Sequence, residues 1–252
     1  MTGAGSHEFR NVWRNVFVYG IMTTIASNLQ AVRDAISAAA VEAGRHENEV
    51  MLLAVSKTFA PDSLREVYGA GQTCFAESYL QEALDKIAAL QDLDIDWHFI
   101  GPIQSNKTRA IAENFAWVHS VDRLKIAQRL SEQRPAHLPP LQVCLQVNIS
   151  GEDTKSGVRP NEASGLAHAI AALPGLKLRG LMAVPAPADD VAAQRLPFAQ
   201  LRKLRDELNR QGLQLDTLSM GMSHDFAAAI AEGATIVRIG TAIFGDRPYR
   251  NA

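Results

Sequence analysis

Apolar positions near the start of the chain recur at every third or fourth residue between residues 22 and 43. The recurring residues are Ile25, Leu29, Val32, Ile36 and Ala40. This spacing predicts an amphipathic helix. Gly44 follows directly and is a typical stop signal for such a helix.

Beyond this helix, short apolar runs alternate with stretches of helical period. The runs that predict strands cover residues 50–56, 73–77, 97–101, 117–121, 141–149, 176–184, 217–222 and 235–240. The stretches that predict helices between them cover residues 62–70, 79–91, 105–114, 122–133, 161–173, 193–211 and 224–232. Strands that alternate with helices in this way are typical of βα units around a parallel sheet.

Eight such units in 252 residues favour an α/β fold of the (β/α)8 TIM-barrel type, which typically needs about 250 residues. A doubly wound open sheet is the alternative, but no glycine-rich fingerprint follows the first predicted strand. We therefore predict a single barrel domain over residues 22–252. Residues 1–21 carry only a short apolar patch, so we interpret them as a disordered or non-native leader without targeting or membrane function.

Composition narrows the class of ligand. An apolar content of 47% can fill a large core, and a net charge of −2 provides no basic field for nucleic acid. We therefore expect a small-molecule ligand. Cys74 and Cys144 lie in separate apolar segments without metal-ligand spacing, which indicates reduced structural thiols in a cytoplasmic protein.

A lysine ends the first predicted strand. Lys57 comes directly after the apolar run and shares a strand face with Leu53 and Val55. In a barrel, active sites form at the carboxyl ends of the strands, so Lys57 would point into the mouth. It could be a surface lysine with a buried stem. Alternatively, a partly desolvated amine has a lowered pKa and can form a Schiff base with an aldehyde.

The last two predicted strands end in the segments "SMGMSHDF" and "VRIGTAIFG". The first contains the Met222–Ser223 turn before a helix predicted to begin at residue 224, and the second contains Gly240 and Thr241. Backbone N–H groups, a hydroxyl and a helix start can together bind a phosphate group. Barrels often bind phosphate after strands seven and eight, so we predict a phosphate site here.

Arg238 precedes Gly240 by two residues and therefore faces the same way. An inward-facing arginine needs either a carboxylate partner or an acceptor on a ligand, such as a ring nitrogen. An aldehyde-reactive lysine, a phosphate site and a polar group for a ring nitrogen together fit pyridoxal 5′-phosphate (PLP).

The chain resembles the YggS/PROSC family of pyridoxal phosphate homeostasis proteins. The matching blocks are "AVSKT" (54–58), "WHFIGPIQSNK" (97–107), "VNIS" with "KSG" (147–157), "RGLMAVP" (179–185), "LSMGMS" (218–223) and "VRIGTAIFG" (237–245). The resemblance implies that Lys57 carries PLP as an internal aldimine, that Ser223, Gly240 and Thr241 hold its phosphate, and that Arg238 approaches its ring nitrogen. Met222 belongs to the same predicted cofactor site.

The chain departs from the family pattern at two positions. The family usually has Asn where Ser78 stands, so a hydroxyl replaces the amide expected beside the cofactor. The family usually has an acidic residue where His224 stands, and we interpret this histidine as a surface or capping group. We interpret Gln104, Asn106 and Lys107 as helix-capping residues, and His98 and His119 as hydrogen-bonded core histidines.

The resemblance implies a PLP-binding protein that stores, buffers or delivers the cofactor, with no established turnover. Racemases of this barrel type need a second base and a further β-domain, for which a chain ending at Ala252 has no room. We therefore expect a monomer that passes PLP to apo PLP-dependent enzymes. The alternatives are an amino-acid racemase with Lys57 as one base, a cofactor-free aldolase-type barrel and, least favoured, a purely structural protein.

Overall fold

The computed structural model describes residues 24–152 and 155–246. The predicted leader, residues 1–21, lies outside the described residues. All eight predicted strands lie within them, and so do the predicted helices apart from residues 22–23 of the first.

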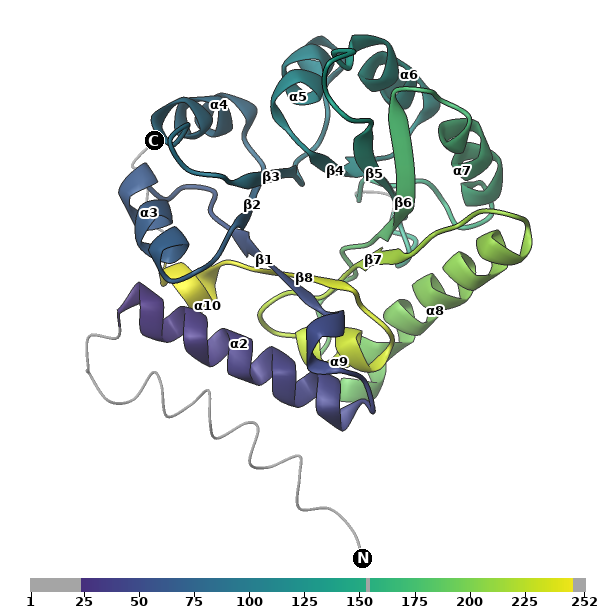
Figure 1. The fold of residues 1–252 in the computed structure, drawn as a ribbon. Helices are drawn as coiled ribbons and strands as arrows, with labels where there is room; N and C mark the ends of the chain where they lie inside the picture. Colours follow the sequence, from purple (N-terminus) through teal and green to yellow (C-terminus); the bar gives the residue numbers. More distant parts are fainter. Residues whose placement is uncertain (1–23, 153–154, 247–252) are drawn as a thin grey trace, which may run out of the picture.

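Eight parallel strands close into a barrel in chain order, and β8 pairs back onto β1 (Figure 1). The strands are β1 (Met51–Val55), β2 (Cys74–Glu77), β3 (Asp96–Phe99), β4 (Trp117–Val121), β5 (Leu141–Gln146), β6 (Leu176–Met182), β7 (Thr217–Ser219) and β8 (Ile236–Ile239). The predicted closed α/β barrel is confirmed.

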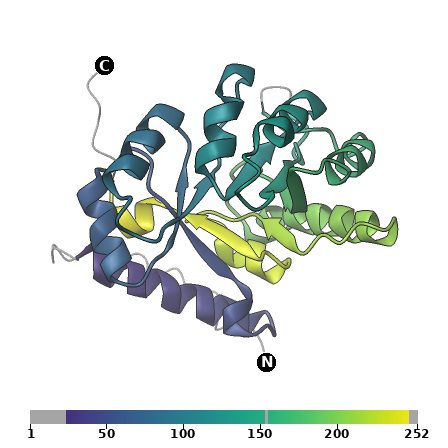
Figure 2. The same ribbon diagram turned by 45° about the horizontal axis from the view of Figure 1, so that its top comes forward.

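Helices surround the barrel on its outside (Figures 1 and 2). They are α2 (Ile25–Glu42), α3 (Pro61–Gly69), α4 (Leu80–Ala89), α5 (Thr108–Asn114), α6 (Leu124–Gln133), α7 (Ala163–Ala171), α8 (Val191–Arg210), α9 (Phe226–Ala231) and α10 (Thr241–Phe244). Short 3-10 turns, η1 (Glu47–Glu49) and η2 (Ser105–Lys107), precede β1 and α5. The sequence pattern did not predict α10.

Helix α2 begins at a side-chain cap, because Thr24 Oγ1 accepts a hydrogen bond from the backbone N–H of Ser27 at 3.1 Å. It lies beside α9 and α10 (Figure 1), burying the apolar stripe that the sequence predicted. Asn28 Nδ2 also donates to the carbonyl oxygen of Ile243 at 3.1 Å. The helix therefore packs against the segments that follow β7 and β8.

Strand alternation divides the core into two parts. Leu52 and Ala54 belong to the large cluster shared with the helices, whereas Leu53 and Val55 belong to a smaller cluster with Ala76 and Ile236. Successive side chains on a strand point to opposite faces, so the smaller cluster lies inside the barrel. A further interior cluster consists of Trp117, Cys144 and Met182.

Both cysteines are free thiols, as predicted. Cys144 is fully buried, and burial raises the pKa of its thiol to about 12. The thiol therefore stays protonated at neutral pH, which suits a structural role.

Several predicted strands were too long, and β5 and β7 differ most, each ending three residues before its predicted end. Strand β5 ends at Gln146, because Val147 forms only an isolated bridge to Val158. Strand β7 ends at Ser219, and Gly221 has a φ of 95°, which takes the chain out of extended geometry.

The capping interpretation of "GPIQSNK" is wrong for Gln104. Its side chain makes no capping hydrogen bond at η2, and Lys107 makes none at α5. Side chains from later residues bind this segment instead. Arg123 Nη2 donates to the carbonyl oxygen of Ile103, and Arg129 Nε donates to that of Ser105.

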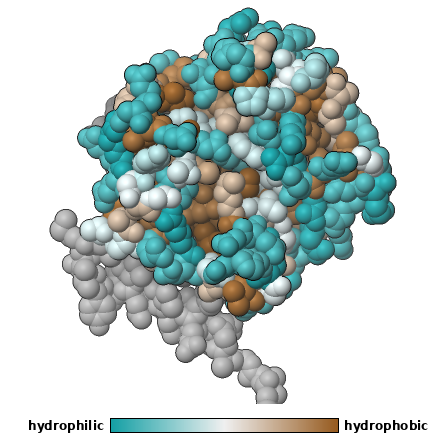
Figure 3. Space-filling view, viewed as in Figure 1, coloured by the Kyte–Doolittle hydropathy of each residue, from teal (hydrophilic) through white to brown (hydrophobic). Residues whose placement is uncertain are grey.

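The visible surface is mostly hydrophilic, and apolar residues interrupt it only in small areas (Figure 3). Among the described helices, none combines the length and apolar content needed to cross a bilayer.

Candidate functional site

The seven predicted site residues lie at or beyond the carboxyl ends of four strands. Lys57 follows β1, Ser78 follows β2, Met222 and Ser223 follow β7, and Arg238, Gly240 and Thr241 lie in or after β8. Strands β7, β8, β1 and β2 are consecutive neighbours in the closed sheet. The fold therefore gathers the seven residues on one side of the barrel mouth.

The ends of β8 and β1 approach each other closely at Gly240. A Cβ atom at this position would lie 2.9 Å from the carbonyl oxygen of Val55 and 3.3 Å from its Cβ. Lys57 is two residues beyond Val55, in the turn that follows β1. The absence of a side chain at Gly240 thus lets the turn after β8 lie against the end of β1, two residues before Lys57.

We expect Gly240→Ala to destabilise the fold by about 1–3 kcal/mol, because the added methyl group must displace backbone atoms of β1. Urea unfolding at equilibrium measures this loss. Gly165→Ala in α7 is the matched control, because nothing lies within 4 Å of its Cβ position. The control should gain up to about 1 kcal/mol from helix propensity, and an equally stable Gly240→Ala protein would contradict the close approach.

Helix α10 begins directly after Gly240. Ile243 and Phe244 donate their backbone N–H groups to the carbonyl oxygen of Gly240, at 2.9 and 3.0 Å. The N–H groups of Thr241 and Ala242 come before this first turn and have no acceptor within the helix. Thr241 is exposed and Gly240 is half-buried, so this turn is accessible from the mouth.

The structure corrects the prediction for the segment after β7. Helix α9 begins at Phe226, not at residue 224, because residues 223–225 form a turn. Asp225 Oδ1 accepts the backbone N–H of Met222 at 2.6 Å, and burial raises the pKa of this carboxyl group. The predicted helix start beside Ser223 is therefore wrong, and the backbone N–H of Met222 already has an acceptor.

Arg238 lies inside the barrel with 5% of its surface exposed. Its guanidinium donates to Ser219 O at 2.6 Å, Ser219 Oγ at 2.8 Å and Ala183 O at 2.9 Å. All three acceptors are neutral, and no carboxylate of the described residues forms a salt bridge with it. The structural ion pair considered as an alternative is therefore not found.

Burial lowers the pKa of Arg238 to about 10, while the charge of Asp225 acts in the opposite direction. The guanidinium therefore remains a cation at neutral pH. A buried cation without a salt-bridge partner is costly. An anionic or hydrogen-bond-accepting ligand at this mouth would reduce that cost.

A buried charged cluster, which the sequence analysis missed, holds the backbone on both sides of Lys57. Ser56 Oγ donates to Glu77 Oε1 at 2.7 Å, on the side before Lys57. On the side after it, the N–H of Thr58 donates to Glu82 Oε1 at 2.5 Å. Thr58 has a φ of 74°, a conformation that threonine rarely adopts, so the surrounding contacts must maintain it.

Lys86 on α4 connects these contacts. Its Nζ donates to Ser56 O at 2.8 Å and to Oε1 of both Glu77 and Glu82 at 2.7 Å. Glu77 is fully buried, and burial raises its pKa although Lys86 and Ser56 oppose the shift. The sequence contained two signals for this cluster: a glutamate ending a buried strand, and a Glu–Lys pair four residues apart on a predicted helix.

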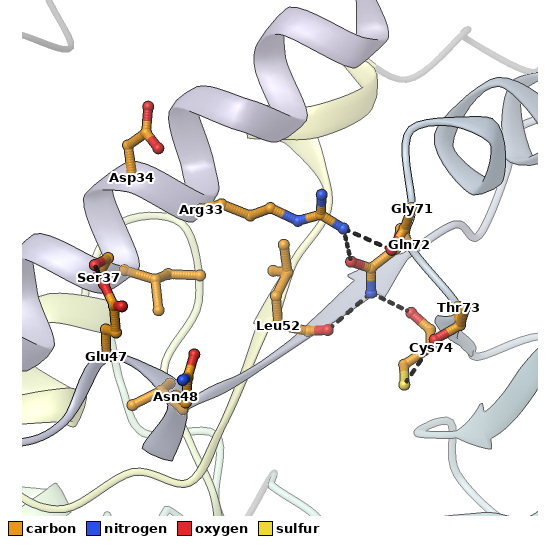
Figure 4. A pocket seen from close by; sticks show the side chains of 12 residues that line it. Arg33, Asp34, Ser37, Glu47, Asn48, Leu52, Gly71, Gln72, Thr73 and Cys74 are labelled. Carbon is orange, nitrogen blue, oxygen red and sulfur yellow. Dashed lines mark hydrogen bonds between the residues drawn. The ribbon is translucent and has the colours of Figure 1, made fainter.

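A pocket of about 470 Å³ lies elsewhere, between α2 and the amino-terminal starts of β1 and β2 (Figure 4). Gln72 Nε2 donates there to the carbonyl oxygens of Leu52 and Cys74, and Arg33 Nη2 donates to Gly71 O. None of the seven predicted site residues lines it. These hydrogen bonds join α2 to the sheet at the opposite end of the strands.

Comparison with known proteins shows to which class of barrel proteins this chain is similar. Residues 22–248 match the family described as "Alanine racemase, N-terminal domain". Alanine racemase of Corynebacterium glutamicum has the same fold, with a TM-score of 0.62 and 21% identity over 89% of this chain and 63% of that one.

Closer relatives define the particular family. The "pyridoxal phosphate homeostasis protein" of Pseudomonas aeruginosa is 63% identical over 228 residues, which cover 90% of this chain and 98% of the relative. PipY of Synechococcus elongatus, solved with PLP bound, is 37% identical with a TM-score of 0.78, over 88% of this chain and all of PipY. The chain therefore belongs to the family of pyridoxal phosphate homeostasis proteins, as its sequence blocks predicted.

Proposed function

We propose that this protein binds PLP covalently through Lys57 and serves in PLP homeostasis, storing the cofactor or delivering it to apo-enzymes. The observation that carries the proposal is the convergence of three features at neighbouring strand ends. Lys57 lies in the turn just after β1, the Gly240–Thr241 turn lies against β1, and Arg238 is a buried cation without a carboxylate partner among the described residues.

These residues fit the chemical groups of PLP. The N–H groups after Gly240 suit phosphate oxygens, with the hydroxyls of Ser223 and Thr241 as further donors. Arg238 can donate to a ring nitrogen, and Ser78 and Met222 would complete the surroundings of the ring. When bound, PLP supplies an aldehyde that primary amines attack and a ring that withdraws electrons.

The residues of this chain have distinct tasks in the proposal. The Lys57 amine adds to the aldehyde with loss of one water molecule, and the cluster of Ser56, Glu77, Glu82 and Lys86 holds its backbone in place. Arg238 remains a donor, which disfavours a proton on the ring nitrogen and weakens the ring as an electron acceptor. That property supports cofactor binding over racemisation.

The relatives support the same choice. The chain matches the homeostasis protein of P. aeruginosa over 98% of that protein, at 63% identity. A monomeric state and a cytoplasmic location stay predictions from the sequence.

Covalent binding is tested by adding PLP, recording the visible spectrum, reducing with borohydride and mapping the peptides by mass spectrometry. We expect a visible band and one pyridoxyl group on Lys57. A protein that stays colourless and unmodified would refute the proposal and leave a cofactor-free barrel.

Delivery is tested with an apo-aminotransferase and a phosphatase that destroys free PLP. We expect the PLP-loaded protein to restore aminotransferase activity despite the phosphatase, whereas an equal amount of free PLP fails. Equal failure of both would contradict direct delivery. Racemisation of L-alanine above the rate with PLP alone, and its loss in Lys57→Ala, would instead establish the racemase alternative.

A further inference from the structure

Two buried histidines lie inside the barrel, apart from the predicted contacts to PLP. His98 on β3 and His119 on β4 are both fully buried. His98 Nδ1 lies 2.9 Å from His119 Nε2, and the His98 ring stacks on Trp117 with centroids 5.4 Å apart. Buried imidazoles need hydrogen-bond partners, and the partners of these two define a path across the barrel.

The path begins at Arg238 and ends at the other mouth. Arg238 Nη1 lies 2.8 Å from Ser219 Oγ, which lies 2.8 Å from His119 Nδ1. Beyond His98, its Nε2 lies 3.4 Å from Asp96 Oδ2, at the amino-terminal start of β3. Strands β4 and β7 are not neighbours in the sheet, so His119 and Ser219 meet across the barrel interior.

Hydrogen-bond chemistry gives this path one direction. A guanidinium can only donate, so Ser219 Oγ accepts from Arg238 and its own proton goes to His119 Nδ1. In a neutral ring the proton then sits on His119 Nε2, which donates to His98 Nδ1. The proton of His98 consequently lies on Nε2 and points toward Asp96.

The reverse direction leaves a polar group unsatisfied. If His119 Nδ1 donated to Ser219 Oγ, the serine proton would need another acceptor. The described residues provide no such acceptor within hydrogen-bond distance of that oxygen. Burial, together with the charge of Arg238, also holds the pKa of His119 well below its ordinary value, so that ring is neutral.

We infer that His119 and His98 are positioning residues, and that the directed chain of hydrogen bonds from Arg238 through Ser219 and His119 to His98 holds the guanidinium in place at the cofactor ring. The role at the ring rests on the proposed function, whereas the chain itself is a property of the protein without cofactor. Ser219 fixes one edge of Arg238 through both its carbonyl and its hydroxyl oxygen. His119 in turn fixes the rotation of that hydroxyl.

A divalent cation is the competing occupant at the far end of the chain. The ligating atoms of Cys74, Asp96 and His98 all lie within 4.8 Å of one another, and His98 Nε2 makes no hydrogen bond of normal geometry. Metal binding needs a lone pair on His98 Nε2. The directed chain places a proton there, so it predicts that the triad does not bind Zn²⁺ through His98.

The first test measures the two tautomers in the apo protein. Long-range ¹H–¹⁵N spectra of histidine-labelled protein should show both buried rings as neutral Nε2–H tautomers, with assignment from single variants. An Nδ1–H tautomer or a charged ring at either position would overturn the inferred direction. A Zn²⁺ titration in which His98 loses its Nε2 proton would also overturn the inferred direction. Neither measurement depends on whether PLP binds.

The second test measures the link to the cofactor site. His119→Leu removes both contacts of the ring, and His119→Asn keeps an acceptor for Ser219. We expect His119→Leu to weaken PLP binding about three- to tenfold, as for the loss of one hydrogen bond, and to shift the visible band. His119→Asn should recover most of both effects.

The matched control is His168→Leu on α7, because that exposed ring lies at hydrogen-bond distance from the carbonyl oxygens of Ser164 and Gln211, outside the barrel interior. If His119→Leu lowers the melting temperature but leaves the band and the PLP affinity unchanged, its role is packing and the inference is wrong. If the unaltered protein binds no PLP, the proposed function fails, while the tautomers still decide the direction of the chain.

Discussion

Replacement of Lys57 by alanine is expected to abolish the covalent attachment of PLP. The variant would keep the Gly240–Thr241 turn and Arg238, so residual non-covalent binding should persist. We expect the affinity for PLP to fall about ten- to hundredfold. The variant loses both the covalent bond to Lys57 and the contact between the charged Lys57 side chain and PLP. Borohydride reduction followed by intact-mass analysis measures the covalent part, and fluorescence titration measures the remaining affinity.

Two further variants separate the amine from its charge and from nonspecific labelling. Lys57→Arg keeps a cation but provides no amine that can form the covalent bond. It should therefore lack the pyridoxyl mass, as the alanine variant does. Lys125→Ala, at an exposed position on α6, should be labelled like the unaltered protein. Labelling of Lys57→Ala at another lysine, to the same extent and with the same visible band, would refute the assignment of Lys57.

Lys86→Met is expected to lower the free energy of unfolding by about 3–5 kcal/mol, because it leaves a buried charge without its partner. Lys86 is 3% exposed and donates to both Glu77 and Glu82. Replacing Lys86 also removes its hydrogen bond to the carbonyl oxygen of Ser56. The backbone next to Lys57 is then held by fewer contacts. Chemical unfolding gives the stability, and PLP titration gives the effect on the site.

The stability loss in Lys86→Met should depend on pH. Burial already raises the pKa of Glu77, and removing Lys86 takes away a cation that opposes the shift. Between its unfolded and folded pKa values, Glu77 then binds more protons in the native state than in the unfolded state. The free energy of unfolding of Lys86→Met therefore falls as the pH rises through this range. The difference in free energy of unfolding between the unaltered protein and Lys86→Met should become smaller at lower pH.

Arg65→Met is the matched control. It breaks a salt bridge with Asp92 at 2.6 Å in which both side chains are about half exposed. Such pairs contribute roughly 0–1 kcal/mol, so the change should be small. A Lys86→Met protein as stable as this control would contradict the importance of the buried cluster. In the double variant Lys86→Met with Glu77→Leu, stability should recover in part, while PLP binding should stay weak if the cluster positions Lys57.

The sequence alone determined the barrel and the composition of its mouth. Strand and helix periods depend on local side-chain spacing, so eight βα units were visible in the pattern, although the ends of β5 and β7 were not. Lys57, Arg238 and Gly240 stood out because each occupies a strand end, where a buried or turning chain restricts the residue type.

Only the tertiary structure decided which groups those residues contact. Lys86 and Glu77 meet because α4 packs over the ends of β1 and β2, and Ser219 meets His119 because the closed sheet brings β7 opposite β4. Contacts between residues about 100 positions apart leave no periodic trace in the sequence. Closure of the barrel creates the hydrogen-bond chain behind Arg238, so its direction and its histidine partners appear only once the strands are placed in space.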